Sequence, residues 1–229
     1  MLTLGIETSG KVASAAIADG ERLIAERILY TRLTHSQIIL PMVQEMLAEC
    51  GLSFKELEAV VCAAGPGSYT GLRIGIAALK GIVMGAPHLK CAAVSTLEAL
   101  AWGCAAFRGR IVPVMYARPQ IVYAGEYESA GGITALSEDR VVNEKEFFGA
   151  LDVSTPVLLT GDRAAEIKGL YFADEPNVLL PPPTQRLQKA SALCEAFLAD
   201  PARAVPPEAL EASYLQATKA EKDKAHRDQ

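Results

Sequence analysis

The chain has 229 residues, of which 50% are hydrophobic and 21% are charged, so it can bury the core of one large domain or two small ones. Its formal net charge of −5 excludes a protein that holds nucleic acid through a broad basic surface of its own. The five cysteines form no C-x-x-C pair, the start of the chain has no basic signal segment, and no apolar run reaches about 18 residues. We therefore expect a soluble protein of the cytoplasm with reduced cysteines.

The first half of the chain predicts a regular order of strands and helices. Short apolar runs separated by turn residues predict strands over residues 2–8, 12–18, 22–29 and 58–64. Apolar residues at helical spacing predict helices over residues 35–50, 72–86 and 96–107. The first of these helices should have Thr34 or Ser36 as its N-cap and should end at Gly51.

The second half repeats this order of elements. It predicts strands over residues 110–116, 121–128, 131–137 and 154–161, and helices over 143–152 and 187–199 that continue and close this half. Two copies of one unit of this kind are the arrangement of the ribonuclease H-like fold of actin, sugar kinases and heat-shock ATPases. We expect an α/β protein with mixed sheets and flanking helices, divided into lobes over 1–107 and 108–229, with a flexible tail from about residue 216.

A glycine-rich segment, "GPGSYTG" over residues 65–71, lies between a predicted strand and a predicted helix. Free backbone N–H groups at a helix start bind anions, but the spelling fits neither the dinucleotide fingerprint nor the P-loop. One interpretation is a tightly turned helix start with Ser68 or Thr70 as N-cap. The other is a vestigial anion or nucleotide loop formed by Glu7, Gly65, Gly67, Ser68, Thr70 and Gly71.

Two charged residues bear on this choice. Glu7 follows the first predicted strand, where the related ATPases place an acidic residue, although "ETSG" also suits an ordinary polar turn. Arg73 stands in the first turn of a helix, where a cation opposes the helix dipole, so a partner from outside the helix is plausible.

Three stretches, "LGIETSG", "THSQIILPMVQEML" and above all "GPGSYTGLRIG", resemble the bacterial TsaB family, the partner protein in synthesis of the tRNA modification threonylcarbamoyladenosine. The resemblance covers residues 1–105, and the second half shares the order of elements and a terminal "ASYLQ", which is similar to the family's closing Tyr-Leu-Arg segment. In "YARPQIVY" the chain departs from the family, because Tyr116, Gln120 and Ile121 replace an acidic residue, a glycine and a glutamate. Arg118 and Tyr123 match the family there.

The resemblance implies a paralogue of the catalytic subunit TsaD without a catalytic or metal site of its own. TsaD proteins hold a metal with an H-x-x-x-H pair, whereas this chain has His35 followed four residues later by Ile39. The implied partners are TsaD and the ATPase subunit TsaE, which would carry the metal and the ATP. Contact with tRNA would come only through the complex, and no membrane is involved.

The helices over 36–50 and 72–86 are the predicted partner surfaces. The first is apolar over a wider arc than a single core-facing stripe needs, and the small residues of the second permit close approach. The predicted interface residues are Ile39, Met42, Val43, Met46, Leu47, Arg73, Gly75 and Ala78. A self-complementary patch of this kind also predicts a weak homodimer. The alternative is a first helix wholly buried in its own subunit.

Two other functions stay open. A small-molecule kinase or ATPase of the same fold would use Glu7 and the 65–71 loop on phosphates. A metal-dependent glycoprotease-like peptidase would need bound zinc, although neither H-E-x-x-H nor G-x-S-x-G occurs in the chain.

Overall fold

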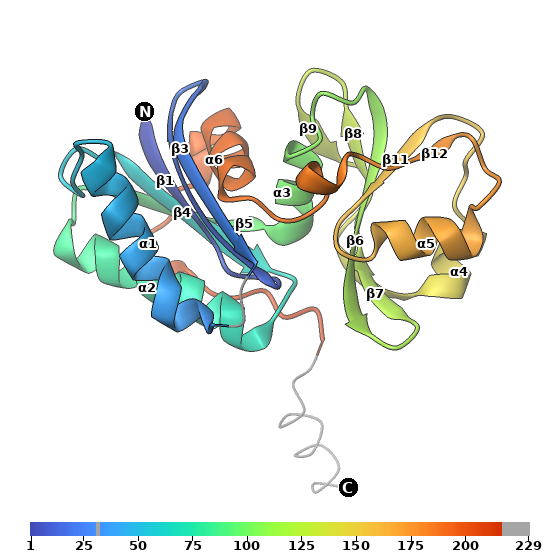
Figure 1. The fold of residues 1–229 in the computed structure, drawn as a ribbon, viewed down its shortest axis with the longest axis horizontal. Helices are drawn as coiled ribbons and strands as arrows, with labels where there is room; N and C mark the ends of the chain where they lie inside the picture. The colour runs from blue at the N-terminus through green and yellow to red at the C-terminus, as the bar shows by residue number, and fades with distance from the viewer. Residues whose placement is uncertain (31–32, 217–229) are drawn as a thin grey trace, which may run out of the picture.

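The first lobe is built on a five-stranded sheet. The computed structural model describes residues 1–30 and 33–216, and Figure 1 shows the two lobes side by side. The strands of the first sheet are, in spatial order, β3 (Arg22–Tyr30), β2 (Val12–Asp19), β1 (Leu2–Glu7), β4 (Ala59–Gly65) and β5 (Lys90–Ser95). Four of these strands match the predicted ones. The sequence pattern does not predict β5, because its Cys-Ala-Ala centre has few of the residues typical of strands.

The second lobe is built on a sheet of the same topology. Its main path comprises β10 (Arg140–Asn143), β7 (Ile121–Ala124), β6 (Gly109–Arg118), β11 (Val157–Thr160) and β12 (Val178–Leu179). β8 (Tyr127–Ser129) pairs with the start of β6, and β9 (Ile133–Ala135) pairs with β8. In both sheets the first three strands of the path are antiparallel and the last two are parallel to the central strand or its neighbour. The predicted α/β class with two related lobes is confirmed.

Parts of the second lobe differ from the prediction. The strand predicted over 121–128 is divided at Gly125 into β7 and β8, which pair with different parts of β6. The helix α5 (Ala164–Tyr171) and the strands β10 and β12 are not predicted, because each is short and only weakly periodic. The predicted helix over 143–152 is present as α4 (Glu144–Gly149), with Asn143 as its N-cap.

One face of the first sheet is covered by α1 (His35–Glu49) and α2 (Tyr69–Gly85), which lie side by side in Figure 1. Thr34 is the N-cap of α1, and Ser68 is the N-cap of α2, where its side chain accepts a hydrogen bond from the Gly71 N–H. Both helices are therefore confirmed. α2 begins three residues before the predicted start because Tyr69 already lies in its first turn.

The other face of the first sheet is covered by α6 (Ala190–Ala199), which corrects the assignment of residues 187–199 to the second half. The N-terminus of α6 is held by the first sheet: Ala190 N–H donates to Ser14 Oγ at 3.1 Å and Ser191 N–H donates to Glu26 Oε1 at 3.0 Å. Gly5 of β1 permits this approach, since a Cβ there would lie 2.4 Å from the Ala190 carbonyl oxygen. The chain thus returns to the first lobe after completing the second sheet.

After α6 the chain crosses the first lobe as a segment that we call the C-terminal strap, residues 204–216. Val205 N–H donates to the Cys91 carbonyl at 2.9 Å, and Ser213 N–H donates to the Ala64 carbonyl at 2.7 Å. Leu210 between them is buried in the core of the first lobe. The predicted flexible tail lies, from residue 217 onward, outside the described residues.

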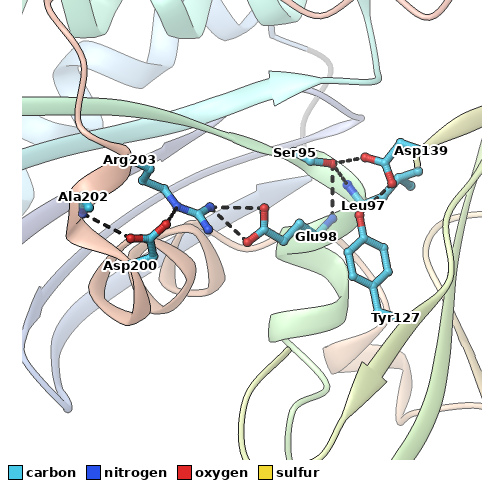
Figure 2. A network of polar contacts seen from close by, with 8 residues as sticks. All are labelled: Ser95, Leu97, Glu98, Tyr127, Asp139, Asp200, Ala202 and Arg203. Carbon is cyan, nitrogen blue, oxygen red and sulfur yellow. Dashed lines mark hydrogen bonds and ion pairs between the residues drawn. The ribbon is translucent and has the colours of Figure 1, made fainter. Parts of the chain in front are cut away.

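The helix α3 (Thr96–Trp102) lies between the two lobes. Leu97 and Leu100 pack against the second sheet, while Ala99 packs with the first lobe and α6. Figure 2 shows the polar contacts around the start of α3, where Ser95 caps the helix and donates to Asp139 of the second lobe. On the side of α6, Glu98 forms an ion pair of 3.0 Å with Arg203 (Figure 2).

None of the helices in the described residues is long and apolar enough to cross a lipid bilayer.

Candidate functional site

The glycine loop, residues 65–71, packs directly on the turn that follows β1. Ser68 N–H donates to the Ser9 carbonyl at 2.7 Å, and Thr8 Oγ1 donates to the Gly71 carbonyl at 2.8 Å. A Cβ on Gly67 would lie 2.4 Å from the Ser9 carbonyl oxygen, and a Cβ on Gly71 would lie 2.1 Å from that of Thr8. The glycines therefore allow two backbones to touch, and Ser68 rather than Thr70 is the cap. These contacts favour the structural interpretation of the loop over the anion-binding one.

Glu7 is fully buried behind this turn. Its Oε1 accepts a hydrogen bond from Ser9 N–H at 2.6 Å, whereas its Oε2 has no hydrogen-bond partner among the described residues. Burial raises the pKa of the Glu7 carboxyl to about 7, although the hydrogen bonds from Ser9 and the Thr8 backbone act in the opposite direction. Glu7 presents no surface to solvent.

The space between the turn at Gly10 of the first lobe and β6 of the second lobe is filled by side chains of the protein. The side chain of Gln188 is buried, and its Nε2 lies 3.4 Å from Met115 Sδ of β6. A Cβ on Gly10 would lie 2.9 Å from the same Nε2, so Gln188 fills the space between the first turn and β6. In the second lobe, Gly161 N–H donates to the Arg186 carbonyl at 2.8 Å. Residues 186–188 thus contact the Gly10 turn of the first lobe and both β6 and Gly161 of the second.

The segment that departs from the family places no carboxylate opposite Glu7. Tyr116 is exposed, and its N–H donates to Asp162 Oδ1 at 2.9 Å. Burial raises the pKa of Asp162, and the nearby Lys11 and Arg163 partly offset this effect. Gln120, at the position of the family's glycine, has a φ of 63°, a left-handed conformation that glycine adopts at low cost.

His35 is bonded to backbone rather than grouped with other metal ligands. Its Nε2 lies 2.8 Å from the Gly10 carbonyl oxygen, while Ile39, one turn on, is buried in the core. Over residues 1–30 and 33–216, no group of three or more His, Cys, Asp or Glu side chains could hold a metal ion.

The predicted interface residues are mostly core residues of the first lobe, which corrects their assignment. Burial is nearly complete for Ile39, Met42, Val43, Met46, Leu47 and Ala78, and Gly75 is buried as well. The α1 residues recur at the i, i+3, i+4, i+7, i+8 spacing of a core-facing stripe. Gly75 faces inward because a Cβ there would lie 2.5 Å from Thr8 Oγ1. Of the eight predicted residues, only Arg73 is exposed.

The outer face of the two helices is formed mostly by other residues, although the predicted Ala78 is one of them. An apolar groove of about 430 Å³ lies between α1 and α2, and we call it the α1–α2 groove. Its lining comprises Leu40, Gln44, Phe54, Ala77, Ala78, Gly81, Ile82, Gly85 and Ala86. A Cβ on Gly81 or Gly85 would have no atom of the described residues within 4 Å. Sequence periodicity shows that both helices are broadly apolar, but it does not show which side faces the sheet.

The comparison with known families agrees with this architecture. The family model described as "TsaD: tRNA N6-adenosine threonylcarbamoyltransferase" matches residues 30–201, which is most of the chain. The chain belongs to this family. Within it, the sequence relatives confirm the resemblance to TsaB (YeaZ) proteins. The Bacillus subtilis protein "tRNA threonylcarbamoyladenosine biosynthesis protein TsaB" is 37% identical over 133 residues, covering 58% of each chain.

Two further comparisons extend this result. The Escherichia coli K12 protein of the same name is 38% identical over 130 residues, covering 56% of this chain and 55% of that protein. The matched stretch therefore spans just over half the length of these relatives. A crystal structure of YeaZ from Pseudomonas aeruginosa has a TM-score of 0.80 at 23% identity and covers 93% of this chain and 99% of its own. At that identity the likeness shows the fold, which extends over both lobes.

Proposed function

We propose that the chain is a non-catalytic subunit that pairs with a TsaD protein through the α1–α2 groove and supports transfer of a threonylcarbamoyl group to adenosine in tRNA. Metal and ATP would belong to TsaD and to the ATPase subunit TsaE, and contact with tRNA would come through the complex. The same exposed groove would let two copies of the chain form a weak homodimer.

The observation that carries this proposal is the open space at Gly81 and Gly85. A glycine inside a helix costs about 0.5–1 kcal/mol of stability relative to alanine. Among the described residues nothing offsets that cost at Gly81, because no atom lies within 4 Å of its Cβ position, in contrast to Gly75 of the same helix. Gly85, the last residue of α2, is equally open. A helix of a partner protein that packs closely on the groove would make contacts that offset that cost. The neighbouring Leu40, 40% exposed, offers apolar surface to the same partner.

The two alternative functions have less support. A kinase or ATPase would need Glu7 to reach metal or phosphate, whereas Glu7 is fully buried and bonded to Ser9 N–H. The space between the Gly10 turn and β6 is filled by Gln188. A zinc peptidase would need a ligand cluster, and His35 instead contacts the Gly10 carbonyl. Calorimetry with MgATP and elemental analysis for zinc test these two functions directly.

The interface is tested by filling the groove. Gly81→Leu places a large side chain where the partner helix would lie, and Gly169→Leu is the matched control, because Gly169 of α5 is also helical with nothing within 4 Å of its Cβ position. We expect Gly81→Leu to abolish binding to the TsaD protein of the same organism, measured by calorimetry. Modified adenosine should also disappear from the tRNA of a strain that depends on the variant. Unchanged affinity for Gly81→Leu would contradict the proposal.

A further inference from the structure

One arginine at the edge of the exposed α2 surface is held in a fixed position by two tyrosines. The Arg73 Cζ lies 4.0 Å from the ring centroid of Tyr69, and Arg73 Nε donates to the Tyr214 hydroxyl at 3.0 Å. The two tyrosine rings pack together, with centroids 4.9 Å apart and planes at 33°. An exposed arginine normally samples many rotamers, so this arrangement restricts the side chain in the free protein.

The two tyrosines leave the outer end of the guanidinium free. Among the described residues, Arg73 Nη1 and Nη2 have neither a hydrogen bond nor an ion pair, although Arg73 is exposed. These two atoms together can form paired hydrogen bonds to a carboxylate or a phosphate. The side chain is therefore preorganised to bind an anionic group from outside the subunit.

Arg73 is continuous with the α1–α2 groove. Arg73, Ala77, Gly81 and Gly85 are spaced four residues apart and are all exposed, so they form one row along α2. With a rise of 1.5 Å per residue, Arg73 lies about 12 Å from Gly81, which is about two helical turns. A partner helix packed on Gly81 and Gly85 would reach Arg73 at one of its ends.

The position of Tyr214 comes from the C-terminal strap. The hydrogen bond from Ser213 N–H to the Ala64 carbonyl fixes the residue before it. Gly65 has a φ of 115°, and a Cβ at this position would lie 2.5 Å from the Ser213 carbonyl oxygen, so the strap can pass only over a glycine. The strap thus passes over the start of α2, and its Tyr214 fixes the orientation of the Arg73 side chain on the exposed surface.

The surroundings of Arg73 favour a protein carboxylate over an RNA phosphate. RNA backbone recognition uses several cations, whereas the chain carries a net charge of −5 and Arg73 is flanked by exposed apolar or aromatic groups. Tyr30, Leu33, Tyr69 and Tyr214 are exposed, and Tyr30 and Leu33 line a pocket at the start of α2 together with one cation, Lys11. Tyrosine and arginine are enriched at the energetic centres of protein interfaces.

We propose that Arg73, held by Tyr69 and Tyr214, binds an Asp or Glu side chain at the end of the partner helix that occupies the α1–α2 groove, and that Tyr214 is a positioning residue for this contact. The inference rests on the proposed function and deepens it, because it names the recognition chemistry at one end of the interface. It also gives the C-terminal strap a part in partner binding.

Four variants test the proposal by calorimetric titration with the TsaD protein. Arg73→Glu should weaken binding by about 30-fold or more, because it replaces attraction by repulsion in a partly desolvated contact. Arg73→Lys keeps the charge but loses the planar fork, and should weaken binding by about 10-fold. Tyr214→Phe keeps the ring and removes the hydrogen bond to Nε, and should weaken binding about 3-fold. Arg22→Glu, at an exposed position of β3, is the matched charge control and should bind like the wild type.

The salt dependence and a compensating variant separate the proposed contact from a general structural effect. The wild-type affinity should fall with added NaCl more steeply than that of Arg73→Ala. Replacing the contacting acid of the partner by Arg should restore binding to Arg73→Glu, and a scan of the partner's acidic residues identifies this position. Thermal unfolding of each variant checks that the fold is retained.

The outcomes distinguish this inference from the proposed function. If Gly81→Leu abolishes binding while Arg73→Glu binds like the wild type, the groove is the interface and the role of Arg73 is wrong. If Arg73→Glu leaves the affinity for the TsaD protein unchanged but lowers the affinity of the pair for tRNA, the group that binds Arg73 is a phosphate and the proposal is overturned. If Gly81→Leu has no effect, the proposed function itself fails.

Discussion

Tyr127 and Asp139 form a hydrogen bond of 2.6 Å, in which the phenol donates to Oδ1, while Ser95 from the other lobe donates to Oδ2 of the same carboxylate (Figure 2). Asp139 is therefore the point at which the second lobe contacts the cap of α3. Burial raises the pKa of Asp139, and both hydrogen bonds act to lower it. This partly buried carboxylate accepts one hydrogen bond from each lobe and is one of the contacts that join them.

Tyr127→Phe should destabilise the protein by about 1–3 kcal/mol at pH 7, because Asp139 Oδ1 loses its donor. The pKa of Asp139 would then rise further above its unfolded value. A carboxyl with a raised pKa in the folded state is disfavoured when ionised, so the destabilisation should be largest at pH 7 and smaller at pH 4. Urea unfolding at both pH values measures this difference. Tyr123→Phe is the control, since the Tyr123 hydroxyl forms no hydrogen bond to another described residue, and an equal loss in both variants would contradict the prediction.

Glu7→Gln should change how stability depends on pH. The pKa of Glu7 is raised from 4.5 to about 7, so between these values the folded state keeps a proton that the unfolded state has lost. The stability of the wild type should therefore fall as pH rises from 4 to 8, by roughly 3 kcal/mol from this group. The glutamine variant lacks this component, and denaturant unfolding across the range should give a flatter profile. Parallel pH profiles for the two proteins would show that Glu7 titrates normally.

The elements that the sequence predicts correctly are those with strong local signals. The three strands from β1 to β3 alternate with clear turn residues, and α1 and α2 have recognisable caps in Thr34 and Ser68. By contrast, β12 has only two residues and the centre of β5 has few residues typical of strands, so periodicity alone does not separate them from loops. The assignment of α6 to the wrong lobe has another cause. Its place depends on Ser14 and Glu26, which lie more than 160 residues earlier in the chain.

In the candidate site too, the sequence predicts what depends on local pattern and misses what depends on contacts between distant residues. Periodicity identifies α1 and α2 as broadly apolar helices, but the choice between core face and outer face depends on which side meets the sheet. The stripe through Met42 and Met46 meets the sheet, and the row through Gly81 and Gly85 does not. The contact of Arg73 with Tyr214 could not be predicted either, since Tyr214 lies 141 residues away in sequence.

Gln120→Gly should stabilise the protein by up to about 1 kcal/mol. Gln120 has a φ of 63° in the turn between β6 and β7, where a side chain raises the backbone energy and glycine does not. The gain is reduced by the greater freedom of glycine in the unfolded chain. Thermal or urea unfolding measures the change, and Gln120→Ala separates the backbone effect from loss of the side chain. If alanine stabilises as much as glycine, the conformation at this turn is not the cause.

Two glycines of the same helix should respond in opposite ways to alanine. Gly75→Ala places a methyl group 2.5 Å from Thr8 Oγ1, which is itself bonded to the Gly71 carbonyl and has little room to move. This overpacking should cost about 1–3 kcal/mol of unfolding free energy. Gly81→Ala meets no atom within 4 Å and should stabilise the helix by about 0.5–1 kcal/mol. Unfolding of the isolated subunit measures both changes, and a destabilising Gly81→Ala would mean that this position is already packed within the subunit, so its free space could no longer support the proposed interface.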